Sequence, residues 1–308
     1  MAPPPVDPAN YPIDTDRYAT ADLTWLDELD ALTVHAGAPH QRMGTRGIDE
    51  RDWLRADEHR VAELALRRRL VVDAPGEVYA AIDGSAAAAE EAAELVHRWL
   101  RTARPDLLDG WHAAEALGLA PLAHAGVAVQ EDLCVMQPRD GAWVLAAALL
   151  CFPTYWRLAD KLGLAQEHVH GPVPHYATDL AERVSRFFDR LGPDRIVSRR
   201  NWGFSAHPLL FVPELDALER PARYEPEAVW LRSERQTLRR LPVSGGVLFT
   251  IRVQLAPAAA LRSRPALAAR LLAAIDGWTP ELVESRGGRT GWVPEVRAFL
   301  QEIAHRHG

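Results

Sequence analysis

Two short segments carry side chains that could bind an anion and a metal ion. Residues 230–253 include five arginines on what the pattern predicts to be a pair of strands, the second of which is an apolar run. Residues 168–174 place two histidines next to prolines. Guanidinium groups bind carboxylates through charged hydrogen bonds, and neutral imidazole is a common metal ligand. We therefore expect an anion-binding sheet face and a metal or cofactor ligand.

The histidine segment is stiffened by Pro172 and Pro174. His168 and His170 are two positions apart, so in an extended backbone they would share one face. A stiff backbone reduces the entropy lost when a side chain is fixed, which suits a metal or haem ligand, and Glu167 or a backbone carbonyl could hold the second ring nitrogen. The alternative is a solvent-facing loop with surface histidines.

Zinc and cysteine ligands are competing interpretations. A zinc site could use His168, His170, His175 and Cys151, but neither a His-Glu-x-x-His pattern nor a Cys-x-x-Cys pair is present. Cys151 ends an apolar segment and is expected to be a buried, inert thiol. The residues alone leave His168, His170 and Cys151 open as the ligand.

Alternation along residues 230–240 divides the polar side chains between two faces of the predicted sheet. The first face carries Arg232, Glu234, Gln236 and Leu238, and the second carries Arg235, Thr237 and Arg239. Either face could bind a carboxylate, with about 1.5–3 kcal/mol from each charged hydrogen bond. The alternative is a solvated face on which Glu234 pairs with an arginine.

The preceding predicted strand supplies Arg199, Arg200, Asn201 and Trp202. A flat aromatic ligand could stack on Trp202, although a tryptophan on a strand is more often a core residue. The amide of Asn201 could bind the same ligand or fix a neighbouring loop.

Composition restricts the class of protein. The chain has 308 residues, 48% of them hydrophobic, which is enough for a substantial core. A net charge of -7 argues against nucleic-acid binding. The longest apolar run, 143–152, is too short to cross a bilayer, and residues 1–12 lack the apolar region of a signal peptide. Two cysteines cannot build a disulfide scaffold, which indicates a reducing compartment. The chain is therefore expected to be a soluble cytoplasmic protein without nucleic-acid or membrane partners.

The secondary structure predicted around these residues indicates an α+β fold. Five antiparallel strands are expected at 127–136, 143–152, 196–204, 230–238 and 246–255. Helices are expected from residue 57 and at 85–101, 177–191, 264–275 and 294–304, with Val61, Leu64, Leu66 and Leu70 forming one buried stripe. Residues 1–41 are interpreted as an N-terminal extension and 42–308 as a single domain. No glycine-rich phosphate loop is present, so a nucleotide site is not expected.

A series of motifs runs in order through residues 42–255. They are Arg42-Met43-Gly44, Asp52-Trp53, Glu63–Leu70, Gln130–Met136, Cys151–Thr154, His170–Pro174, Arg199 with Asn201-Trp202, Glu234–Pro242 and Leu248–Arg252. In these motifs the chain resembles the haem-dependent oxidative N-demethylase family, α-subunit-like. The motif that begins at Glu234 is long enough to be specific. Two positions depart from the family pattern, His175 after the second proline and Gln254 after Arg252-Val253 of the last strand, and both could alter the substrate pocket.

The resemblance implies a fold and an activity. The expected fold is PAS-like, a five-stranded antiparallel sheet with flanking helices that holds a b-type haem (heme b) and its iron. The expected reaction is a monooxygenation that removes a methyl group from a small amine as formaldehyde, using O₂. Because the chain has no flavin or iron–sulfur signature, electrons would come from a separate reductase.

The resemblance also implies site residues. His170 is the expected iron ligand, and the expected cofactor-binding residues are His170, Arg199, Asn201, Trp202, Arg235 and Arg239. Two alternatives stay open, a haem-binding PAS-type sensor or partner module, and a haem enzyme for another nitrogen oxidation.

Overall fold

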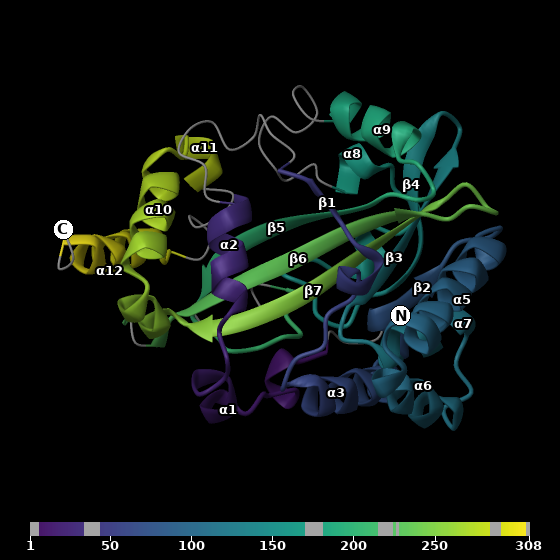
Figure 1. The fold of residues 1–308 in the computed structure, drawn as a ribbon, viewed down its shortest axis with the longest axis horizontal. Helices are drawn as coiled ribbons and strands as arrows, with labels where there is room; N and C mark the ends of the chain where they lie inside the picture. Colours follow the sequence, from purple (N-terminus) through teal and green to yellow (C-terminus); the bar gives the residue numbers. More distant parts are fainter. Residues whose placement is uncertain are drawn as a thin grey trace.

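A seven-stranded antiparallel sheet forms the framework of the protein (Figure 1). The computed structural model describes residues 6–33, 44–169, 181–214, 224–225, 228–283 and 291–305. The strand order is β1-β5-β6-β7-β3-β4-β2. The strands are β1 (Arg46–Ile48), β2 (Tyr79–Ala81), β3 (Asp132–Arg139), β4 (Ala142–Leu149), β5 (Ile196–Ser205), β6 (Trp230–Arg240) and β7 (Val247–Pro257).

The α+β layout is confirmed, but the predicted five-stranded PAS-like sheet is wrong. The five long strands β3 to β7 correspond to the predicted ones. Two further strands, β1 and β2, pair with β5 and β4 over three residues each. A segment of three residues is too short for alternation to be recognised, so the sequence pattern could not predict these edge strands.

The predicted hairpins form, but β3 begins later and β4 ends earlier than predicted. Asp140 and Gly141 both have positive φ, 50° and 80°, as a two-residue turn between β3 and β4 requires. The first strand begins later than predicted, because Val127 and Ala128 end helix α7. An uninterrupted apolar run is buried equally well as helix or strand, so its pattern does not mark the transition.

Helices occupy most of the remaining described chain. The longer ones are α2 (Trp25–Thr33), α3 (Arg60–Asp73), α5 (Ala86–Ala103), α6 (Leu108–Glu115), α7 (Pro121–Ala128), α9 (Ala181–Arg190), α10 (Pro265–Asp276) and α12 (Val293–His305). The short ones are α1 (Thr15–Ala19), α4 (Pro75–Val78), α8 (Gln166–Val169), α11 (Pro280–Val283), and the 3₁₀ turns η1 (Pro8–Asn10), η3 (Glu50–Asp52), η4 (Pro105–Leu107), η5 (Leu158–Asp160) and η8 (Ala258–Ser263).

The predicted helices agree with these elements in most places. Helices α5, α10 and α12 match their predicted ranges to within two residues, and α9 covers residues 181–190 of the range predicted at 177–191. In α3, Leu64 and Leu70 are buried as predicted, whereas Val61 is 72% exposed. The buried positions of that helix include the charged residues Glu63 and Arg67, which an apolar stripe does not reveal.

The two faces of the sheet are covered by different parts of the chain. The face that carries Arg235, called the Arg235 face, packs against apolar residues of α2, α5, α7, α10 and α12. Helix α2 contacts β5 and lies across the sheet in Figure 1. The opposite face, called the Glu234 face, packs against α9 and Leu210-Phe211. The segment 6–33 also enters the core, since Tyr11 and Tyr18 are buried in the same cluster.

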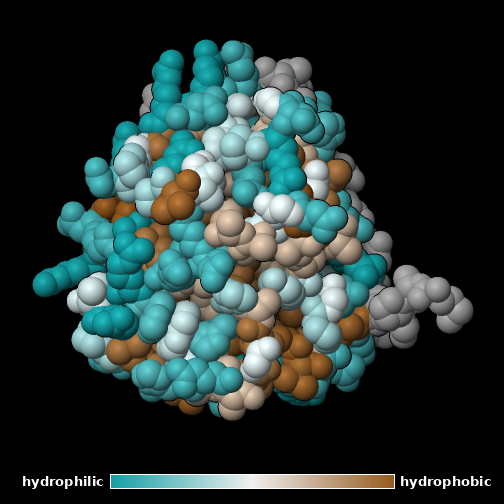
Figure 2. Space-filling model, turned by 90° about the vertical axis from the view of Figure 1, so that its right-hand side faces the viewer, coloured by the Kyte–Doolittle hydropathy of each residue, from teal (hydrophilic) through white to brown (hydrophobic). Residues whose placement is uncertain are grey.

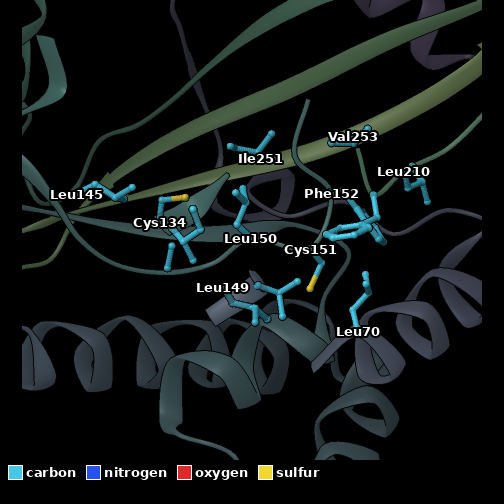
Figure 3. Close-up of a cluster of buried hydrophobic side chains, with 14 of the residues drawn as sticks. Leu70, Cys134, Leu145, Leu149, Leu150, Cys151, Phe152, Leu210, Ile251 and Val253 are labelled. Carbon is cyan, nitrogen blue, oxygen red and sulfur yellow. The ribbon is translucent and has the colours of Figure 1, made fainter. Parts of the chain in front are cut away.

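Both cysteines are free and buried. Cys151 lies in the cluster that contains Leu70, Leu149 and Phe152 (Figure 3). Burial raises the pKa of its thiol to about 12, so the thiol is protonated at neutral pH. The predicted burial of Cys151 is therefore confirmed.

The surface at the right-hand end of Figure 1, where α9 and the β6–β7 hairpin lie, is mostly hydrophilic (Figure 2). Within the described ranges, no helix combines the length and apolar character that a bilayer crossing requires.

Candidate functional site

A strip of half-buried polar side chains crosses β5 and β6 on the Glu234 face. Arg199 is paired with Gln236 and Asn201 with Glu234 in the register of the two strands, so all four side chains share one face. The structure therefore brings the predicted residues Arg199 and Asn201 together. It also places beside them Glu234 and Gln236, which were not among the predicted site residues.

The apolar half of this face comes from β7. Glu234 is paired with Val253, Gln236 with Ile251, and Leu238 with Phe249. Val253 is fully buried and Ile251 is 7% exposed, whereas Phe249 is half-buried. In Figure 3, Ile251 and Val253 lie on β7 and belong to the buried cluster. The polar strip is thus bordered by the dry, apolar core.

Glu234 is held by neutral donors. The hydroxyl of Thr154 donates to its Oε1 at 2.6 Å, and Nε2 of Gln236 donates to its Oε2 at 3.0 Å. Within the described residues, the Glu234 carboxylate has no ion-pair partner within 4.0 Å. The alternative in which it pairs with an arginine is therefore not seen there.

Arg232, on the same face, has a structural role. Its Nε donates to Thr154 Oγ1 at 2.8 Å, and its Nη atoms donate to backbone carbonyls of Phe152, Pro153, Leu209 and Leu210 at 2.8–3.1 Å. Arg232 thereby ties the segment after β4 to the segment after β5 and orients the Thr154 hydroxyl toward Glu234.

Arg235 and Arg239 lie on the opposite face of the sheet from Arg199 and Asn201. The guanidinium of Arg235 donates to the carbonyls of Trp53 and Asp52, and burial lowers its pKa to about 10. Arg239 donates to both carboxylate oxygens of Glu50, at 2.7 and 3.0 Å, and lies over the Trp53 ring. The structure does not bring these two arginines to the polar strip.

Trp202 also projects from the Arg235 face. It is 6% exposed and packs against Phe204 and Trp278, with Trp292 completing the aromatic cluster beneath α10 and α12. This is the position of a core residue, which was the alternative interpretation of Trp202.

His170 and residues 171–180, including His175, lie outside the described residues. The described elements on either side are α8, which ends at Val169, and α9, which begins at Ala181. Both helices lie beside β4 (Figure 1), where Phe188 of α9 packs against Trp143 at 5.3 Å. His168 is described, and its side chain is 68% exposed. No group of three His, Cys, Asp or Glu side chains suited to a metal occurs among the residues that the structure describes.

A buried ion pair connects α3 to the start of β3. Arg67 and Asp132 are both fully buried, with Nη1 and Oδ1 2.9 Å apart. Arg67 also donates to the carbonyls of Gly126 and Glu131, each at 2.7 Å. The Asp132 carboxylate accepts hydrogen bonds from the backbone N–H groups of Cys151 and Phe152 at 2.7 and 3.1 Å. Motifs that carried the family resemblance therefore build the framework of the sheet.

A second buried network surrounds Arg252 of β7. Its Nη1 lies 2.8 Å from Glu63 Oε2, and its Nη2 lies 2.6 Å from Asp57 Oδ2. The amide of Gln130 donates to both Asp57 and Glu63, and Tyr18 OH donates to Glu63 at 2.7 Å. Glu63 and Arg67 are four apart and lie on one side of α3, but this spacing is also that of an exposed helix pair, so it did not indicate burial.

The Asp57 contact predicts a dependence of stability on pH. Burial alone would raise the pKa of Asp57, but the Arg252 guanidinium and the Gln130 amide outweigh it and hold the pKa below 3.8. Its contribution to folding is then fully present above pH 3.8 and is lost as the pH falls through the lower, folded-state pKa. We expect Asp57→Asn to be less stable than wild type in urea unfolding at about pH 6, with a smaller difference at about pH 3. A difference that is unchanged between the two pH values would contradict this.

The model of the haem-dependent oxidative N-demethylase, alpha subunit-like family matches residues 44–293. The match includes every described strand and the polar strip on the Glu234 face. The chain belongs to the haem-dependent oxidative N-demethylase, alpha subunit-like family.

Proposed function

We propose that this protein uses a b-type haem to oxidise a small amine at a methyl carbon next to nitrogen. The family description assigns haem-dependent oxidative chemistry to its members. The proposed reaction consumes the amine, O₂, two electrons and two protons, and yields the demethylated amine, formaldehyde and water. The observation that carries the proposal is the Glu234 face, where guanidinium, amide and carboxylate groups adjoin an apolar surface.

The side-chain chemistry of this face is compatible with a haem. Haem combines a flat apolar ring with two carboxylates, and the guanidinium of Arg199 and the amide of Asn201 are suitable donors for those carboxylates. The half-buried ring of Phe249, with Ile251 beside it, offers apolar contact for the porphyrin. When bound, haem would supply O₂ activation and the oxidising power for the C–H bond.

We propose His170 as the iron ligand. Two other candidates are less suitable in the described structure. The Cys151 thiol is buried, and its pKa of about 12 disfavours the thiolate that would bind iron. The His168 side chain is 68% exposed, in a position where water competes for its ring nitrogens.

The contacts of Arg235 and Arg239 support a positioning role instead of direct contact with haem. Both hold residues 50–53 against the Arg235 face. Electrons are proposed to come from a separate reductase, because two buried cysteines cannot hold an iron–sulfur centre.

The test is turnover by the haem-loaded protein with dimethylammonium, O₂ and a supply of electrons. Formaldehyde and methylamine in equal amounts would support demethylation. An oxygenated nitrogen product would favour the second candidate, another nitrogen oxidation. Gas binding to the reduced protein without amine consumption would contradict an enzyme and favour a sensor.

A further inference from the structure

We infer that Glu234 is the anchor for the positively charged nitrogen of an alkylammonium substrate. This inference rests on the proposed function and adds to it the charge state of the substrate and the residue that recognises it. It is carried by the position of Glu234, by its hydrogen-bond partners and by the apolar residues beside it.

Glu234 occupies the boundary between the polar and apolar halves of its face. Its neighbour on β5 is Asn201, and its neighbour on β7 is Val253. Val253 is fully buried, so one side of the carboxylate borders a dry region, in which electrostatic interactions are stronger than in water. A small cation at this position would have its nitrogen next to Glu234 and its methyl groups toward Val253 and Ile251, the nearest apolar residues of β7 in the register.

The carboxylate has the capacity to accept such a cation. An ionised carboxylate can accept about four hydrogen bonds, and the structure shows one to each oxygen of Glu234. Both hydrogen-bond donors, Thr154 and Gln236, are neutral, and within the described residues no cation lies within 4.0 Å of the carboxylate; the Arg232 guanidinium interacts with it electrostatically from the far side of Thr154. A half-buried anion in this state favours a ligand that brings both a positive charge and an N–H donor.

The carboxylate is also held in one orientation before the ligand arrives. Thr154 Oγ1 accepts from Arg232 Nε at 2.8 Å, which leaves its own proton directed at Glu234. The remaining guanidinium nitrogens of Arg232 donate to four backbone carbonyls, so this chain of contacts is fixed to the backbone at its far end. Preorganisation of this kind lowers the entropy lost on binding.

The charges on the Glu234 face also orient a bound ligand. Arg199 lies diagonally across the register from Glu234, opposite Gln236. A guanidinium there favours carboxylates, in the proposed function those of haem, and repels a cation. The positive end of a substrate is therefore directed to Glu234 and Asn201, and uncharged molecules of the same shape gain nothing from the carboxylate.

The experiment measures binding of two ligands with the same heavy-atom skeleton, dimethylammonium and the uncharged dimethyl ether, to the haem-loaded protein. Ferric haem enhances the relaxation of methyl protons in a bound ligand, so an NMR titration in sealed tubes gives a dissociation constant without turnover. We expect wild type to bind the ether at least about tenfold more weakly, and Glu234→Gln to bind dimethylammonium about 10- to 100-fold more weakly, as loss of a charged hydrogen bond implies.

Glu115→Gln is the matched control, because Glu115 is exposed and pairs with His112 on α6. It should bind both ligands as wild type does. Equal binding of the two ligands by wild type, unchanged binding by Glu234→Gln, or no dimethylammonium binding by haem-loaded wild type would each overturn the inference. If Glu234→Gln does not fold, the comparison of the two ligands in wild type still tests whether binding depends on the positive charge of the ligand. A protein that takes up no haem overturns the proposed function itself and is recognised beforehand by its absorption spectrum.

Discussion

Asp132→Ala is expected to lower the free energy of unfolding by about 3–5 kcal/mol, because it leaves the fully buried Arg67 without its counter-ion. The same change removes the acceptor for the backbone N–H groups of Cys151 and Phe152. A buried polar group that loses its partner contributes its own desolvation penalty, so the effects add in the same direction. Urea denaturation followed by circular dichroism measures the difference.

The matched control is Asp73→Ala. Asp73 pairs with Arg69 on the same helix, but the two side chains are 41% and 55% exposed. Exposed pairs of this kind contribute less than about 1 kcal/mol. An Asp132→Ala protein as stable as the Asp73→Ala protein would contradict the structural role of the Arg67–Asp132 pair.

His170→Ala is expected to weaken haem binding by at least about 100-fold, since even the loss of a residue that only supports a metal ligand weakens affinity about 10- to 100-fold. The reason is the direct loss of the proposed iron ligand. Hemin titration followed at the Soret band measures the affinity, and the reduced spectrum reports the ligand.

His168→Ala is the control for this change. Its side chain is exposed and lies two positions from His170, so it tests a nearby histidine without the proposed ligand role. It should retain the wild-type affinity for hemin. Loss of haem from His168→Ala with retention by His170→Ala would reassign the ligand.

The long strands were predictable because each is specified locally. Alternation with a period of two, together with turn residues such as Asp140-Gly141, determines where a strand runs and where it reverses. The edge strands β1 and β2 depend on long-range pairing with β5 and β4, and three residues carry too little pattern. This is why a five-stranded PAS-like sheet was predicted and a seven-stranded sheet is found.

For the candidate site, the sequence predicted only which side chains of a single strand share a face. Alternation correctly separated Glu234 and Gln236 from Arg235 and Arg239. It could not show which face would be closed by helices, because that depends on contacts between distant segments, such as those of Arg235 with residues 52 and 53. Arg235 and Arg239 were therefore grouped with Arg199, although Arg199 lies on the opposite face of the sheet.

The buried charges escaped the sequence analysis for a related reason. Arg67 and Glu63 lie on a helix whose apolar positions suggested that charged residues would face water. Their partners Asp132 and Arg252 are 65 and 189 positions away, and only the folded chain brings them together. A charged residue in a family motif can thus either stabilise the fold or bind a ligand, and its burial in the structure distinguishes the two roles.

The most direct test of haem dependence is the absorption spectrum of the purified wild-type protein, before and after addition of hemin. Haem binding predicts a Soret band that shifts on reduction with dithionite and again on addition of CO. A colourless protein that takes up no hemin would contradict it.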